Sequence, residues 1–149
     1  MSCLFDSVSS YTKNCSSPQL RQMVADYLST DPCFWGDMRF STVFQWFDPK
    51  DVHYCKHTDE YIRLMRNDST WGGALEIQSM CNMFNIGIRV YIAGGTGGTG
   101  GTGARVPIEF VPAANMNPSL PIEYVLDITW DGCHFEAFSE IANRRALSR

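Results

Sequence analysis

Glycine is scarce in this sequence except in one short segment. Seven of the twelve glycines fall in residues 94–103, which read GGTGGTGGTG, and only five are left for the other 139 positions. Average usage is about 7%, so the rest of the chain is poor in glycine. The repeated segment is typical of an engineered linker, and we exclude it from the fold.

Long apolar segments and an excess of positive charge are also missing. No uninterrupted apolar stretch approaches the roughly 18–20 residues of a membrane span, and the first residues lack the basic and apolar parts of a secretory signal. The net charge is −4, whereas a surface that binds nucleic acid needs clustered Lys and Arg. We therefore expect a soluble protein whose partners include neither a membrane nor a nucleic acid.

Cysteine pairs with metal-ligand spacing are absent as well. The six cysteines lie at positions 3, 15, 33, 55, 81 and 133 and form no C-x-x-C pair. On a helix, His53, Cys55 and His57 would spread around the surface rather than converge on zinc. A core of this size needs no disulfides. We expect free thiols in a reducing, cytosolic compartment, and neither a metal nor another cofactor.

The remaining composition is that of an ordinary globular domain. The chain has 149 residues, of which 44% are hydrophobic and 19% charged. Single domains most often contain roughly 100–150 residues. We therefore expect one domain over residues 1–149, acting as a monomer.

The first part of the chain has the apolar spacing of helices. Ser17 and Pro18 predict the start of a helix that ends before Asp31, and Thr58 is a candidate cap for another. Gly87 suits the stop after a later one. The predicted helices cover residues 3–12, 17–30, 59–67 and 73–85, and short helices joined by turns are expected over residues 33–57.

After Gly87 the pattern changes to alternation of β-branched or aromatic residues with polar ones, which is typical of strands. The predicted strands are residues 88–93, 105–112, 122–130 and 134–140, with turns at residues 115–118 and 131–132. Because the helices come first and the strands follow, the order favours a segregated α+β domain.

Cys3 and His134 are the candidate catalytic pair. A helix N-terminus stabilises a thiolate by its partial positive charge, and a distant histidine at the start of a late strand is the base that cysteine hydrolases use. Spacing alone leaves open that Cys3 is a core residue, since free cysteine is often buried. Cys133 is the poorer nucleophile because neighbouring strand residues point to opposite faces.

Four short motifs contain Cys3 and His134 or lie between them in the sequence. They are Cys3-Leu4-Phe5 at a helix start, TWGGALEI at residues 70–77, IRVY at residues 88–91, and His134-Phe135-Glu136 at a late strand. Their order and intervals resemble the ovarian tumour (OTU) family of cysteine proteases, with its C-L-F, W-G-G-x-x-E and H-[YF]-[DNE]-like motifs. The resemblance covers nearly the whole domain. It implies a papain-like α+β fold, with helices packed on a small, mainly antiparallel sheet.

The resemblance further implies deubiquitination, the hydrolysis of an isopeptide bond at the C-terminal glycine of ubiquitin. Cys3 would attack the carbonyl carbon, His134 would act as general base and acid, and backbone N–H groups would hold the oxyanion. Glu136 occupies the position where the family often orients the histidine with Asp or Asn. The implied partner is ubiquitin or polyubiquitin, and bacterial or viral members that act inside a host cell would suit such a sequence.

Acidic residues gather in the second part of the chain. Residues 104–143 contain six Asp and Glu against Arg105 alone, which agrees with a groove for the basic tail of ubiquitin. Two alternatives stay open. One is a ubiquitin-binding module with weak turnover, motivated by Glu136 and by the lack of the family's acidic and glycine residues before Cys3. The other is a cysteine protease for another ubiquitin-like protein.

The glycine-rich segment and the position of Cys3 suggest a joint explanation. Our hypothesis is a circular permutant, in which residues 94–103 join the native termini and the chain opens before Cys3. The alternative is that these residues replace a loop after Ala93. A source gene in which residues 1–93 precede residues 104–149, with a longer insert between them, would exclude permutation.

Overall fold

A computed structural model describes residues 3–12, 14–92, 106–113 and 121–137. The described elements, in chain order, are α1 (Cys3–Thr12), α2 (Ser17–Ser29), β1 (Cys33–Trp35), β2 (Met38–Arg39), α3 (Phe40–Phe44), the 3₁₀ helix η1 (Pro49–Val52), α4 (Thr58–Met65), α5 (Ala74–Phe84), β3 (Gly87–Ile92), β4 (Ile108–Phe110), β5 (Val125–Trp130) and β6 (Phe135–Ala137). Helices precede the larger sheet, so the expected α+β class is confirmed.

Within the described residues, the larger sheet has four strands in the order β4-β3-β5-β6. β3 pairs antiparallel with β4 and parallel with β5, in the register that places Ile88 opposite Leu126, and β5 pairs antiparallel with β6. Two of the three pairings are antiparallel, as the family resemblance implied. The glycine-rich residues 94–103 join the antiparallel neighbours β3 and β4 but lie outside the described residues, so permutation and loop replacement both stay hypotheses.

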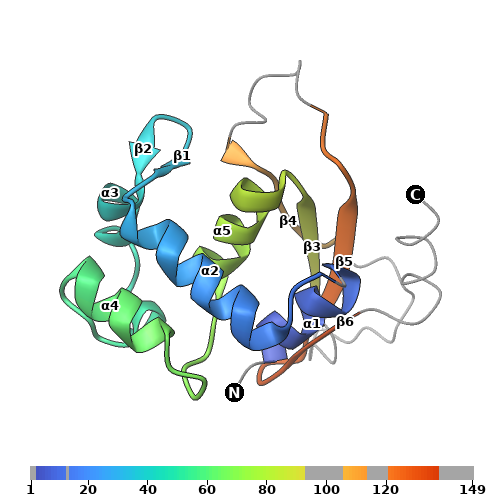
Figure 1. Cartoon of the computed structure of the whole chain (residues 1–149), viewed down its shortest axis with the longest axis horizontal. Coiled ribbons are helices and arrows are strands. Elements are labelled where there is room, and N and C mark those ends of the chain that lie inside the picture. The colour runs from blue at the N-terminus through green and yellow to red at the C-terminus, as the bar shows by residue number, and fades with distance from the viewer. Residues whose placement is uncertain (1–2, 13, 93–105, 114–120, 138–149) are drawn as a thin grey trace.

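The helices and the sheet share one core. The sheet lies at one end of the molecule, α3, α4 and the β1–β2 hairpin lie at the other, and α2 and α5 run between them (Figure 1). α1 packs against β6 and β5, and α5 packs against β3 and β4. The predicted apolar stripe of α1, formed by Leu4, Phe5, Val8 and Tyr11, is buried, and the Tyr11 hydroxyl donates to the Asp127 carbonyl oxygen at 2.8 Å. This anchors α1 on the sheet.

The predicted bounds of α1 are confirmed, whereas the ends of α2, α4 and α5 differ from the predictions by one or two residues. Ser16, not Ser17, caps α2, because its hydroxyl accepts the Gln19 N–H while the Gln19 side chain accepts the Ser16 N–H in return. This reciprocal pair is a capping box. α4 begins at Thr58 after His57, which makes no side-chain cap bond. α5 stops at Asn85, whose φ of 53° is left-handed, and not at Gly87.

The aromatic-rich segment contains strands that the helical interpretation missed. Residues 33–57 do form the short helices α3 and η1, but they begin with the β1–β2 hairpin, which turns at Gly36 with φ of 57°. Gly36 and Asp37 are the two residues of that turn. A two-residue turn that contains glycine and lies between two short extended segments is typical of a β-hairpin. This was the sequence signal that could have predicted β1 and β2.

Within the described ranges, no helix has the length and apolarity that crossing a bilayer requires.

Candidate active site

The structure brings the two ends of the described chain together at Cys3. The half-buried Cys3 begins α1, and the backbone N–H of Phe135 points at its Sγ atom with an N to S distance of 3.5 Å. Phe135 begins β6, and His134 immediately precedes it in the turn from β5. The predicted nucleophile and the main chain next to the predicted base are therefore neighbours, although 132 residues separate Cys3 from Phe135.

His134 and Glu136 lie on either side of this contact. Both residues are exposed, with His134 just before the strand and Glu136 within it, opposite Thr129. The carbonyl oxygen of Glu136 accepts a long hydrogen bond, 3.5 Å, from the Thr129 hydroxyl. The orienting role of the Glu136 carboxylate therefore stays a prediction.

All six cysteines are free thiols, as predicted. Cys133 is exposed in the same turn as His134 rather than on a strand. The expectation that Cys133 and His134 point to opposite faces of a strand therefore does not apply. Among the described residues, no group of three or more His, Cys, Asp or Glu could hold a metal ion. His53 instead lies with Nε2 3.0 Å from the Trp71 carbonyl oxygen.

The first turn of α1 is held in place by the loop that precedes α5. A Cβ atom on Gly72 would lie 2.9 Å from Cδ2 of Leu4 and 3.3 Å from Cε2 of Phe5. The loop and the helix that carries Cys3 approach each other so closely because Gly72 has no side chain. The predicted architectural role of this glycine is confirmed, whereas a Cβ on Gly73 would meet no atom within 4 Å.

We expect Gly72→Ala to impair the site and Gly73→Ala to be tolerated. The new methyl group must displace Leu4 or Phe5, and overpacking of this kind costs about 1–3 kcal/mol. The displacement would move Cys3 relative to β6, so kcat should fall. Thermal unfolding and turnover of the two variants measure the effect, and equal behaviour of both would contradict it.

Glu76 lies buried beneath this loop. One carboxylate oxygen accepts the Gly73 N–H at 2.7 Å and the other accepts the Tyr61 hydroxyl at 2.6 Å, while only 1% of the residue is exposed. The predicted stabilisation of the α5 N-terminus is thus present, together with a tie to α4. Burial raises the pKa of Glu76 to about 7, although both hydrogen bonds and the nearby Arg21 act in the opposite direction.

We expect Glu76 to make stability depend on pH. Its folded pKa is raised, so the protonated form favours folding, and this contribution is fully present below about pH 4.5 and is lost as pH rises through 7. At 1.36 kcal/mol per pKa unit, the loss is on the order of 3 kcal/mol. The free energy of unfolding of the wild type minus that of Glu76→Gln should fall by this amount between pH 4.5 and 7.5. A pH-independent difference would contradict the expectation.

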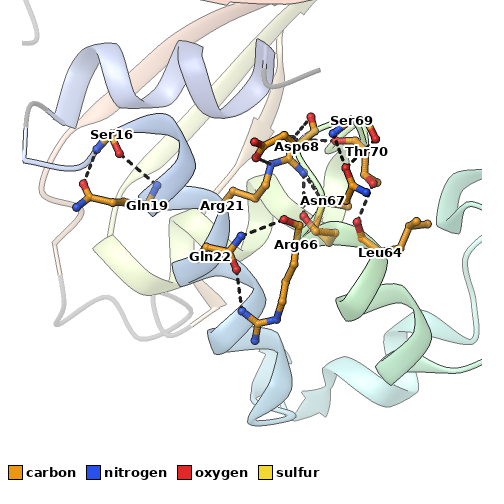
Figure 2. Close-up of polar contacts among 11 residues, drawn as sticks. Ser16, Gln19, Arg21, Gln22, Leu64, Arg66, Asn67, Asp68, Ser69 and Thr70 are labelled. Carbon is orange, nitrogen blue, oxygen red and sulfur yellow. Dashed lines mark hydrogen bonds and ion pairs between the residues drawn. The ribbon is translucent and has the colours of Figure 1, made fainter.

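A buried arginine also packs against the first turn of α1. Arg21 of α2 has no exposed surface, and its guanidinium lies 4.5 Å from the centre of the Phe5 ring. It donates to the carbonyl oxygens of Met65 at 2.8 Å and of Thr70 at 2.9 Å. Figure 2 shows the side chain reaching from α2 toward residues 67–70. Arg21 therefore connects α1, α2, α4 and the loop before α5.

A row of packed aromatic side chains connects the loop before α5 with β6. Trp71 contacts Trp130 edge-on, with the ring centroids 6.5 Å apart, and Trp130 packs on Phe135 at 4.5 Å. Trp130 and Phe135 also line an apolar pocket of about 150 Å³ between α5 and the sheet, beside Ile77 and Ile92. The predicted packing of Trp71 at the helix entry is present, although 39% of the residue stays exposed.

The acidic surplus is only partly available to a basic ligand. Asp127 is used internally, because its two oxygens accept from Arg89 at 2.6 and 3.0 Å, a bond that raises the pKa of Arg89. Asp131 is exposed in the turn before β6 and Glu136 within β6, while Glu109 and Glu123 are exposed earlier in the chain. Arg105 and Glu140 lie outside the described residues.

The comparison with known families agrees with this geometry. The profile of the family described as OTU-like cysteine protease matches residues 2–135, a span that includes Cys3, the W-G-G loop and His134. The chain belongs to the OTU family. It is therefore a thiol protease domain, and the resemblance that the four motifs suggested is confirmed.

Solved OTU structures share the fold at low identity. The OTU domain of OTUD1 has a TM-score of 0.65 at 16% identity, with 93% of this chain and 79% of that chain covered. An OTU deubiquitinase from Wolbachia pipientis wMel bound to ubiquitin has 0.55 at 17%, covering 91% and 88%. The viral OTU protease of Dera Ghazi Khan virus has 0.56 at 16%, covering 93% and 76%. No curated protein matches the sequence significantly.

Proposed function

We propose that this OTU domain is a cysteine-dependent deubiquitinase that cleaves isopeptide bonds at the C-terminal glycine of ubiquitin. The observation that carries the proposal is the contact of the Cys3 thiol with β6, directly after His134, in a chain of the OTU family. The similar Wolbachia enzyme is an OTU deubiquitinase bound to ubiquitin, which supports ubiquitin as the substrate.

The proposed reaction needs only groups of the chain and water. The Cys3 thiol gives its proton to His134 and its sulfur bonds to the carbonyl carbon of the terminal glycine. The tetrahedral intermediate then expels the lysine amine, which receives the proton from His134, and water hydrolyses the remaining thioester. The N–H of Phe135 is aimed at Sγ, so the sulfur already lies against the strand that follows His134.

The two other groups in the proposed site are the oxyanion donors and Glu136. The N–H of Cys3 at the start of α1 is one donor, since the first N–H groups of a helix have no partner inside the helix. Glu136 is the group that the family pattern nominates to orient the imidazole of His134. The exposed Glu136 would also face the basic tail of ubiquitin.

A ubiquitin probe tests the proposal. Ubiquitin that carries an electrophile at its C-terminus should form a covalent adduct, and peptide mapping should place the adduct on Cys3 and not on the exposed Cys133. Reversible binding without capture would support the ubiquitin-binding module instead. Capture by a probe of another ubiquitin-like protein, without capture by ubiquitin, would move the activity to that substrate.

A further inference from the structure

The turn between β5 and β6 is closed by one residue, Asp131, through its side chain and its backbone. One carboxylate oxygen of Asp131, Oδ1, accepts the N–H of Cys133 at 2.8 Å and the N–H of His134 at 2.7 Å. The backbone N–H of Asp131 donates in turn to the carbonyl oxygen of His134 at 3.2 Å. Gly132 supplies the left-handed φ of 100° that the turn requires. Both polar main-chain groups of His134 are therefore bonded to Asp131.

This arrangement matters because the turn is exposed. All four of its residues, 131–134, are exposed to solvent, so little packing holds the main chain of His134. Hydrogen bonding to the backbone lowers the pKa of Asp131, chiefly through the N–H groups of His134 and Cys133. The acceptor is thus a carboxylate at neutral pH, and a carboxylate is the stronger partner for an N–H group.

The turn also sets the position of the next residue. Phe135 follows His134 directly, and its N–H meets the Cys3 sulfur. A change in the main chain at His134 therefore changes the distance between the imidazole and the thiol. Misplacement of a reacting group by about 1 Å can lower a rate about 100-fold.

We propose that Asp131 is a positioning residue of the active site, holding the main chain of His134 so that its imidazole reaches the Cys3 thiol. This inference rests on the proposed roles of Cys3 and His134. It gives Asp131 no contact with the substrate. It differs from the role considered for Glu136, because Asp131 acts through the backbone of His134 and not through its ring.

Two variants test whether the hydrogen-bond acceptor Oδ1 of Asp131 is the atom that matters. Asp131→Asn keeps an Oδ1 atom that can accept the same two N–H bonds, whereas Asp131→Ala removes the acceptor. Glu123→Ala, which removes an exposed carboxylate elsewhere, is the control for net charge. With a ubiquitin substrate, Asp131→Ala should lower kcat about 10- to 100-fold and leave KM within about twofold. Asp131→Asn and Glu123→Ala should stay within about threefold of the wild type in kcat.

A second measurement does not depend on ubiquitin. Iodoacetamide alkylates thiolates, so its rate at Cys3, mapped by mass at pH 6, reports the pairing of the thiol with the imidazole. Asp131→Ala should slow this rate about tenfold, in the direction of His134→Ala, while Asp131→Asn should not. Thermal unfolding midpoints identify any variant that is merely less folded, and its rates are then scaled to the folded fraction.

The outcomes distinguish this inference from the proposed function. Rates for Asp131→Ala that equal those of the wild type would overturn the positioning role, and so would an Asp131→Asn variant as slow as Asp131→Ala. If the wild type leaves ubiquitin substrates intact but the alkylation rates follow the expected order, the substrate assignment fails and the positioning role stands.

Discussion

Replacing Cys3 with alanine should abolish hydrolysis of diubiquitin, with a loss of at least about 10³-fold in kcat/KM. The reason is chemical, because alanine has no atom that can form the thioester and water alone attacks an amide slowly. Among the described residues, Cys3 is the cysteine whose sulfur contacts the main chain of β6. A gel assay of diubiquitin cleavage measures the loss.

The matched control is Cys133→Ala. Cys133 is an equally free and more exposed thiol, one residue before His134, and we expect its removal to leave kcat/KM within about twofold. Cys3→Ala should still bind ubiquitin, because the alanine removes only the sulfur atom. Activity that survives in Cys3→Ala but disappears in Cys133→Ala would show that the nucleophile is misassigned.

Replacing Arg21 with alanine should produce the largest loss of stability. The side chain is completely buried and supplies hydrogen bonds to the carbonyl oxygens of Met65 and Thr70, along with a contact on the Phe5 ring. Truncation leaves a cavity and unpaired carbonyl groups, so we expect a loss of about 3–5 kcal/mol in the free energy of unfolding. Urea titration of the two proteins gives the difference.

Two further variants test whether that loss comes from the burial and hydrogen bonds of Arg21. Arg66 pairs with Asp26 at 2.8 Å, but the side chains are 39% and 69% exposed, so Arg66→Ala should cost at most about 1 kcal/mol. Figure 2 shows both arginines in one view. Arg21→Met fills most of the volume without hydrogen bonds and should fall between the wild type and Arg21→Ala. An Arg21→Ala variant as stable as Arg66→Ala would refute the bracing role.

Local patterns in the sequence predicted the elements that depend on local chemistry. The apolar spacing of Leu4, Phe5 and Val8 located α1, and the change from helical to alternating spacing near residue 87 located the start of β3. The cap of α2 was misplaced by one residue because Ser16 and Ser17 both precede Pro18. The glutamine three residues after Ser16 was the signal that decides between them.

Features that depend on distant contacts could not be predicted in this way. Arg21 has the helical spacing of the buried Val24 and Leu28, but arginine is seldom fully buried, and the carbonyl groups that pair with it lie 44 and 49 residues farther along the chain. The parallel pairing of β3 with β5 is equally nonlocal. Asp131 was predicted only as a turn residue. Asp-Gly three residues before a candidate histidine was the available signal for more, but which N–H groups the carboxylate accepts required coordinates.

Because Cys3 and β6 lie far apart in the sequence, the active site can form only after most of the chain has been synthesised. The nucleophile is synthesised first, whereas the strand that meets it comes 132 residues later. At about 5–20 residues per second, the ribosome needs roughly 7–26 seconds to add the missing segment. Contacts of such high sequence separation also form slowly in folding. A nascent or partly folded chain thus carries its thiol without its histidine, and we expect proteolytic activity to appear only when β6 has joined the sheet.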